Sequence, residues 1–507
     1  MIEVAILDEP DLIFGARKEE KDPRIGLRQF GPYYTQEEGR PSPSLVRVGI
    51  IGSGPTITIA EDVLNRLSGP VPSSHYNKWA NPDYDGFSIE NQVRCEFVVS
   101  EIWNAKITPQ EVKQVIDVGS PSERIGRAVR LFLGKLQQIA AEESPPDVVI
   151  LALPQEIVDY CGISEQTRGA KKPRFTPHER LMAELKEKNQ RFLDDWGLEV
   201  SGGPPEPEAR DYDFRNAVKG KVMAVGIPVQ LLKEETAKKF IDGSGEKDGS
   251  LIRASFAWNF ATGLYYKAKG KPWRLARLTP GTCYVGVSFY RDLRSPRLDL
   301  ETSMAQVFTH NGDGFVLRGG EVLVDAGSKE PHLSEQQAED LLSSVIKMYG
   351  RKAGTHPARV VLHKTSRFSS EERSGFLKAL QLLPFDFVAI SSQAPFRALR
   401  LGNFPVLRGT LVRIQDGEFC LYTSGYASRL RTYPGRRVPG ALYVRHEGVS
   451  QPKILAEEIL GLTKLNWNTT TFATRMPITL EFAKQVGKVL SELEHGVPLQ
   501  DHYRFYM

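Results

Sequence analysis

Largely apolar segments that alternate with amphipathic stretches constrain the fold of the N-terminal half of this sequence. Strands are predicted at Leu45–Ile51, Val93–Val99 and Asp147–Leu153. Helices are predicted between them, at Ile59–Leu67 and Ser122–Glu143. Strands that are apolar along most of their length are typical of a parallel sheet that helices cover on both faces. The sequence therefore predicts an α/β domain with a parallel sheet in this half.

The pattern changes after Pro272 and Trp273. Consecutive strands come first, and strand–helix alternation follows them. A well-marked helix starts at a capping box formed by Ser334 and Gln337 and is expected to stop at Gly350. The other predicted elements are Thr282–Tyr290, Met304–His310, Gly314–Arg318, Arg359–His363, Glu371–Leu383 and Ile478–Glu494. This order is the one expected for an RNase H-like fold.

Length and composition limit the class of protein. A chain of 507 residues is too long for one ordinary core, so about two to four domains are expected. The net charge of +4 permits nucleic-acid binding only through a local basic patch. Four widely spaced cysteines without a CxxC pair argue against zinc and disulfides. Without a signal-like start or a membrane-length apolar run, we expect a cytoplasmic protein with no membrane partner.

A candidate anion site combines basic residues from two distant segments. Arg215 and Lys219 are four residues apart, so on a helix they share one face. Together with Gln230 and the later Lys267, they would supply fixed cations and an amide to a doubly charged phosphate. Spacing alone leaves open a simpler interpretation, in which Arg215 and Lys219 form a solvated basic helix face.

The segment between Lys219 and Gln230 is predicted to change from helix to strand. Gly220 can end the helix, because glycine is favoured just beyond the last helical residue. The apolar run Val222–Val225 then predicts a short buried strand that leads to Gln230.

Together with Tyr265–Trp273, these basic residues resemble the 5′-phosphate pocket in the MID domain of Argonaute proteins. The resemblance covers nearly the whole chain: Glu9–Gly15, Asp22–Leu27 and Phe30–Pro32 resemble the segment before MID, and Thr282–Ser288 resembles the first PIWI strand. It implies an N-terminal segment (1–40), a Rossmann-like MID domain that binds the guide 5′-phosphate (41–274) and an RNase H-like PIWI domain (275–507). The order and length resemble the short prokaryotic branch, which has MID and PIWI but neither an N-terminal lobe nor a PAZ domain.

Active PIWI domains use carboxylates to hold two divalent cations beside the scissile phosphate. In this sequence the matching positions are degenerate: Ser288, Thr365 and Lys484, while the mobile glutamate of the family is not placed. Hydroxyl groups are poor sole ligands for Mg²⁺, and a lysine repels it. The resemblance therefore implies a PIWI domain that binds a guide–target duplex without cutting it, so the chain is not expected to be an enzyme.

Two further expectations concern the phosphate site. In related short Argonautes a divalent cation can bridge the guide phosphate and the terminal carboxylate, which makes Met507 a candidate Mg²⁺ ligand with a structural role. The alternative is a C-terminus that simply packs on a neighbouring strand. Arg215 departs from the commonest pattern of the family, in which many relatives carry His or Tyr at the matching position.

The resemblance implies that the chain is the recognition subunit of a prokaryotic immune complex. The guide would be a 5′-phosphorylated small RNA, and the target would be single-stranded DNA of plasmids or phage. A separate APAZ protein would form a heterodimer with the chain, and target binding would activate its TIR or sirtuin-like NAD-depleting domain, or a nuclease. A higher oligomer on target binding is left open. The alternative is that the chain itself is a guide-directed, metal-dependent endonuclease.

Overall fold

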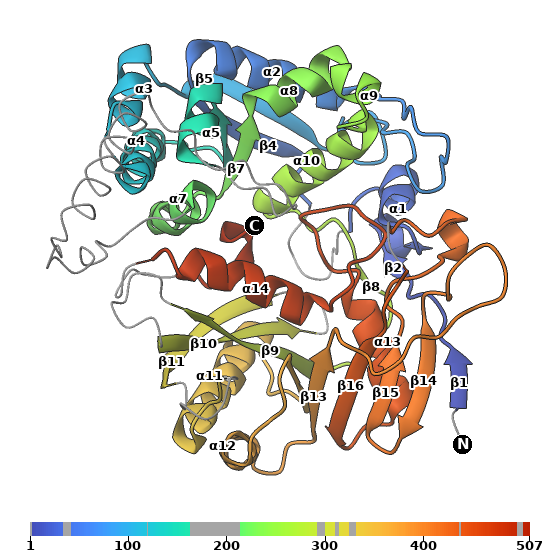
Figure 1. The fold of residues 1–507 in the computed structure, drawn as a ribbon. Coiled ribbons are helices and arrows are strands. Elements are labelled where there is room, and N and C mark those ends of the chain that lie inside the picture. Colours follow the sequence, from blue (N-terminus) through green and yellow to red (C-terminus); the bar gives the residue numbers. More distant parts are fainter. Residues whose placement is uncertain are drawn as a thin grey trace, which may run out of the picture.

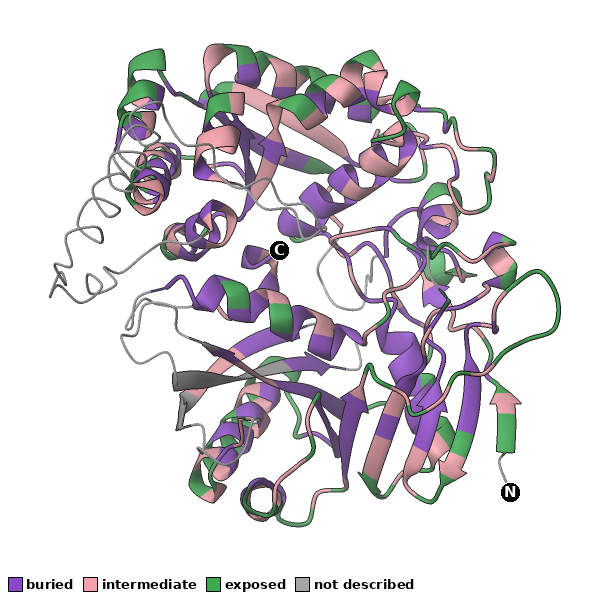
Figure 2. Ribbon diagram, viewed as in Figure 1, coloured by how far each residue is buried: buried purple, intermediate pink, exposed green. Residues whose placement is uncertain are grey.

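The structure is a computed structural model, and it describes residues 3–33, 42–118, 120–162, 213–291, 300–309, 314–323, 331–435, 438–493 and 500–507. Two α/β halves lie one above the other in Figure 1, each with its own sheet. Buried residues follow both sheets and the helix faces that pack on them (Figure 2). Among the described residues, no helix combines the length and the apolar character needed to cross a lipid bilayer.

The first half contains a parallel four-stranded sheet with the order β5-β4-β6-β7. Its strands are β4 (Leu45–Gly52), β5 (Glu96–Lys106), β6 (Val148–Leu153) and β7 (Val229–Lys233). Every residue of β6 is buried, as expected for a central strand covered on both faces. The predicted strands at 45–51 and 147–153 are confirmed, whereas the second strand starts three residues later than Val93 and runs on to Lys106.

Helices cover both faces of this sheet, which confirms the predicted α/β pattern. Two apolar cores lie on its opposite faces, one against α2, α8 and α10 and the other against α3, α4, α5 and α7. The bounds are α2 (Gly54–Ser68), α3 (Pro109–Ile116), α4 (Pro121–Ala140), α5 (Gln155–Cys161), α7 (Phe214–Val222), α8 (Glu234–Asp242) and α10 (Arg253–Lys267). The short helix α9 (Ser244–Lys247) joins α8 to α10.

The second half is built on a mixed nine-stranded sheet with the order β1-β14-β15-β16-β13-β12-β9-β10-β11. Strands β9, β10 and β11 follow one another in antiparallel pairs, and β12 is parallel to both β9 and β13. The bounds are β9 (Thr282–Arg291), β10 (Leu300–Thr309), β11 (Gly314–Leu323), β12 (Arg359–Lys364), β13 (Phe385–Ser391), β14 (Thr410–Gln415), β15 (Glu418–Leu421) and β16 (Leu442–Gly448). The predicted run of strands, followed by strand–helix alternation, is confirmed.

Four of the described helices pack on this sheet. One apolar core holds α11 (Glu335–Ala353) and α12 (Ser370–Leu380) against one face. On the other face lie α13 (Pro452–Leu462) and α14 (Ile478–Leu490), which share the large core that also extends into the first half. Helix α14 therefore lies between the second sheet and the first half, as Figure 1 shows.

The N-terminal residues join the second sheet instead of the first. Strand β1 (Glu3–Ile6) pairs antiparallel with β14, although about 400 residues separate the partners along the chain. A small three-stranded sheet then links β2 (Leu12–Ile13), β3 (Glu19–Glu20) and β8 (Arg274–Leu275). Helix α1 (Pro23–Phe30) follows this pairing and is capped by the side chain of Asp22.

Three local predictions are wrong. The run Val222–Val225 is not a strand: α7 continues to Val222, and a 3₁₀ turn, η2 (Met223–Val225), follows it. Gly226, with φ of 80°, ends this turn in the left-handed region that glycine favours. Gly220 lies inside α7 and allows close packing, since a Cβ atom there would come within 2.7 Å of Leu493 Cδ2. Helix α11 likewise passes Gly350 and is capped by Gly354 at φ of 72°.

Candidate anion-binding site

Three elements of the first half bring the predicted basic residues to one place. Helix α7 carries Arg215 and Lys219, strand β7 carries Gln230, and α10 ends at Lys267. The Nζ atom of Lys267 donates a hydrogen bond to Oε1 of Gln230 over 2.5 Å. The charge of Arg215 acts on both lysines. We call Arg215, Lys219, Gln230 and Lys267 the basic cluster.

Both lysines of the basic cluster are buried, and this burial controls their protonation. Lys219 is 3% exposed and Lys267 is 1% exposed. Burial, followed by the positive charge of Arg215, lowers the pKa of Lys267 to about 7. For Lys219, burial and then the charges of Arg215 and Lys267 lower the pKa well below its ordinary value, and Asp213 opposes the shift only weakly. Like charges in a desolvated place make such a site receptive to an anion.

The last residues of the chain close the cluster on one side. The Nζ atom of Lys219 lies 3.5 Å from the backbone carbonyl of Tyr506, at the limit of a hydrogen bond. Met507 is buried beside it in the sequence, and the 3₁₀ turn η4 (Tyr503–Phe505) contacts α10. Sequence analysis did not identify Tyr506, because a backbone carbonyl leaves no signal in the residue pattern.

The arrangement is suited to a phosphate group. Neither Lys219 nor Lys267 has an ion-pair partner among the described residues. An anion placed between them would restore their charged forms and receive hydrogen bonds from ammonium groups. Each such charge-assisted bond contributes about 1.5–3 kcal/mol.

The three degenerate PIWI positions lie elsewhere, on the second sheet and on α14. Ser288 is half-buried on β9, and its Oγ atom has no hydrogen-bond partner among the described residues. Thr365 directly follows β12 and is exposed, and Lys484 is exposed on α14. The parallel register pairs Val287 of β9 with Lys364 of β12, and Ser288 and Thr365 are the next residues along these two neighbouring segments.

A metal ion at these positions would need several ligating side chains close together. Within the part of the chain that the structure describes, no group of three or more His, Cys, Asp or Glu residues is placed to hold a metal ion. His363, on the same strand as Lys364, is buried and forms a 2.8 Å hydrogen bond with Thr479 Oγ1. Burial lowers its pKa to about 3, so the ring is neutral at ordinary pH.

No protein-family model matches this sequence, and no curated protein matches it. Solved structures of Argonaute proteins do match. Clostridium butyricum Argonaute, bound to a guide DNA (5′ deoxycytidine) and a 19-mer target DNA, has a TM-score of 0.61 at 14% identity and covers 99% of this chain. A. aeolicus Argonaute (TM-score 0.55, 15% identity, 98% of this chain) and Drosophila Piwi (0.55, 13%, 99%) are also similar.

The chain spans 55%, 54% and 56% of these three structures, about half of their length. At this level of identity the likeness establishes the fold. The predicted fold class, a Rossmann-like MID domain with a parallel sheet followed by an RNase H-like PIWI domain, is confirmed: the fold is of the Argonaute type.

Proposed function

We propose that this chain binds the 5′-phosphate of a small guide RNA in the basic cluster and pairs the guide with a single-stranded DNA target. The observation that carries the proposal is the burial of Lys219 and Lys267, two ammonium groups without an ion-pair partner among the described residues, beside Arg215 and Gln230. The Argonaute-type fold supports it, since a similar protein was solved with guide and target DNA.

We further propose that the chain recognises its target without cutting it. Ser288, Thr365 and Lys484 supply two hydroxyls and a cation where a two-metal site requires carboxylates. The reaction would then belong to a separate APAZ protein of the short Argonaute type. Target binding would activate its TIR, sirtuin-like or nuclease domain in defence against plasmids or phage.

The residues of the basic cluster fit a phosphate better than a bare Mg²⁺ ion. Mg²⁺ prefers carboxylate and water oxygens, whereas the side chains gathered here are three basic groups and one amide. Mg²⁺ alone is disfavoured in such a place. We therefore propose Mg²⁺ only together with the bound phosphate, with the carboxylate of Met507 as its protein ligand. Chelation should weaken guide binding less than the loss of both lysines does.

The test compares guides with a 5′-phosphate and a 5′-hydroxyl. Two charge-assisted bonds correspond to a preference of about 100-fold or more for the phosphate. Substituting Lys219→Ala together with Lys267→Ala should remove this preference. The control is Lys238→Ala with Lys453→Ala, which removes the same charge from exposed side chains. A preference that survives in the double variant would mean that the site is misplaced.

Catalysis is tested separately. The purified chain with a phosphorylated guide, a matched single-stranded DNA target and Mg²⁺ should leave the target intact. Cleavage that disappears on chelation would instead support the alternative of a guide-directed, metal-dependent endonuclease.

A further inference from the structure

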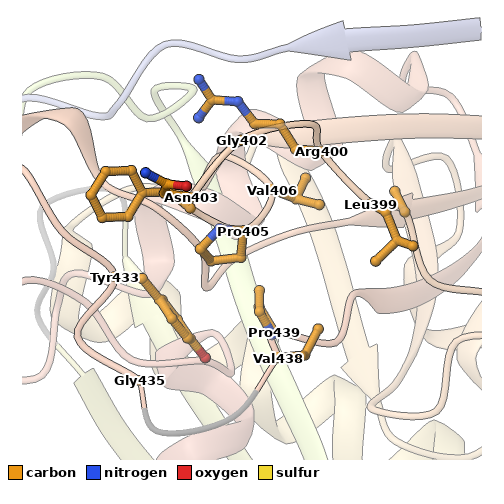
Figure 3. A pocket seen from close by; sticks show the side chains of 12 residues that line it. Leu399, Arg400, Gly402, Asn403, Pro405, Val406, Tyr433, Gly435, Val438 and Pro439 are labelled. Carbon is orange, nitrogen blue, oxygen red and sulfur yellow. The ribbon is translucent and has the colours of Figure 1, made fainter.

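An open pocket lies on the second half, away from the basic cluster, where the loop between β13 and β14 meets the loop before β16. Its volume is about 360 Å³, and Figure 3 shows the side chains around it. Its lining is mostly apolar and includes Leu399, Phe404, Val406, Tyr433, Val438 and Pro439.

The rim of this pocket exposes large apolar side chains to solvent. Leu399 is 88% exposed, and Leu401, next to the lining residues in sequence, is 100% exposed. Phe404 and Val438 are exposed as well, although both line the pocket. Several large apolar side chains exposed around one hollow are typical of a protein interaction site, whereas a single exposed leucine is not.

The two segments that form this region carry positive charge only. Neither 387–415 nor 419–446 contains an aspartate or a glutamate. Among the described arginines of these segments, four pair with carboxylates from other parts of the chain: Arg408 with Glu9, Arg413 with Asp416, Arg429 with Glu20 and Arg445 with Glu418. Arg400 lines the pocket, and neither Arg397 nor Arg400 has an ion-pair partner among the described residues. Two guanidinium groups without an ion-pair partner among the described residues, beside an apolar pocket, attract an acidic partner.

We propose that this surface binds a segment of another protein in which apolar side chains alternate with carboxylates. The apolar side chains of the segment would enter the pocket beside Leu399 and Val438. Its carboxylates would meet Arg397 and Arg400 at the rim. The proposal stands independently of guide binding, because none of these residues belongs to the basic cluster.

The chemistry of the pocket favours a protein segment over a nucleic acid. Single-stranded nucleic acids bind mainly by stacking their bases on free aromatic rings. Here the exposed side chains are chiefly aliphatic, and the ring of Phe404 already packs against Tyr426, with 4.5 Å between the ring centroids. The guanidinium of Arg400 lies 5.8 Å from the same Tyr426 ring.

The test uses a short fluorescent peptide of alternating leucine and aspartate, with fluorescence anisotropy as the measurement. Leucine–lysine and serine–aspartate peptides of equal length are the comparators. The leucine–aspartate peptide should bind about tenfold tighter than either one. Equal binding of all three peptides would overturn the proposal. Displacement of the peptide by a single-stranded oligonucleotide at equal concentration would also overturn it, in favour of a nucleic-acid surface.

Two variants locate the binding. Leu401→Asp and Arg400→Glu should each weaken binding of the leucine–aspartate peptide about tenfold. Both side chains are exposed, so the fold should be retained, and an unchanged melting temperature checks this. The matched control is Leu382→Asp, because Leu382 is 98% exposed but lies just after α12, which ends at Leu380. A control that weakens binding as much as Leu401→Asp would contradict the location.

Discussion

Lys267 at the end of α10 donates a 2.5 Å hydrogen bond to Gln230 on β7, and this contact joins a helix to a strand through a buried ammonium group. Because burial and Arg215 lower the pKa of Lys267 to about 7, its charge is only partly present near neutral pH. Two pH-dependent properties follow from this pKa.

The first is stability without ligand. The pKa of Lys267 is about 7 in the folded chain and 10.5 in the unfolded chain, so between these values the unfolded state binds more protons. The free energy of unfolding should therefore rise with pH across this window, by roughly 3–5 kcal/mol in total. Urea unfolding at several pH values measures it. Lys267→Met should make the rise smaller and leave the contribution of Lys219, whose pKa is also lowered; an equally steep rise in this variant would assign it to other groups.

The second property is affinity for a phosphorylated guide, which should change in the opposite direction. The phosphate needs the charged form of Lys267, and this form is lost as the pH rises through about 7. Binding of a 5′-phosphorylated guide should therefore weaken from about pH 6 to pH 8, by up to about tenfold for one proton. A 5′-hydroxyl guide provides the control. An equal loss for both guides would place the titrating group outside the phosphate contact.

Replacing Lys219 by methionine separates binding from folding. Methionine fills similar space without a buried charge, so the free energy of unfolding should stay the same or increase. Affinity for a phosphorylated guide should fall more than about tenfold. Lys238→Met, on the exposed side of α8 where Lys238 pairs with Glu234, should change neither property by much. A Lys219→Met variant that unfolds readily yet binds normally would indicate a purely structural lysine.

Local sequence patterns predict the basic residues of this site, but they do not predict the backbone carbonyl that lies against it. The spacing of Arg215 and Lys219 predicts a shared helix face, and α7 provides it. The carbonyl of Tyr506 comes from a residue 287 positions beyond Lys219, so only tertiary packing brings it near. The convergence of Gln230 and Lys267 likewise depends on how β7 and α10 pack in the parallel-sheet half.

One wrong prediction and one missed strand have different physical causes. A short apolar run such as Val222–Val225 fits either a strand or a helical turn, because four residues cannot separate a period of 2 from one of 3.6. Strand β1 (Glu3–Ile6) gives no signal either, since its side chains remain largely exposed at the sheet edge. What defines it is backbone pairing with β14, which is remote in the sequence.

Gly286 sets how closely α14 approaches β9. A Cβ atom there would come within 2.1 Å of the backbone carbonyl oxygen of Thr479, which cannot move aside as a flexible side chain could. Gly286→Ala should therefore destabilise the chain by about 1–3 kcal/mol. The control is Gly134→Ala inside α4, where nothing lies within 4 Å of the new atom and helix propensity should add about 0.5–1 kcal/mol. The melting temperature should fall in Gly286→Ala and rise in Gly134→Ala. Shifts of the same sign in both variants would contradict the packing argument.

Glu9 connects the N-terminal segment to the second half, because its carboxylate accepts hydrogen bonds from two buried cations. Its carboxylate lies 2.8 Å from Arg408 Nε and 2.8 Å from Lys464 Nζ. Glu9→Gln would leave both cations without this charge, so the free energy of unfolding should fall by about 3–5 kcal/mol. Glu3→Gln is the matched control, because Glu3 is exposed and its ion pair with Arg413 is longer, at 3.6 Å. It should cost less than about 0.5 kcal/mol.

The same carboxylate should make the attachment of the N-terminal segment to the second half sensitive to acid. Burial raises the pKa of Glu9, but the charges of Arg408 and Lys464 outweigh it and hold the pKa below 4.5. Its stabilisation is therefore complete above about pH 4.5 and is lost as the pH falls through the lower folded value. Urea unfolding of the wild type and Glu9→Gln should differ at neutral pH and converge in acid. A difference that persists unchanged in acid would show that the glutamine acts by misfitting the site instead of by removing its charge.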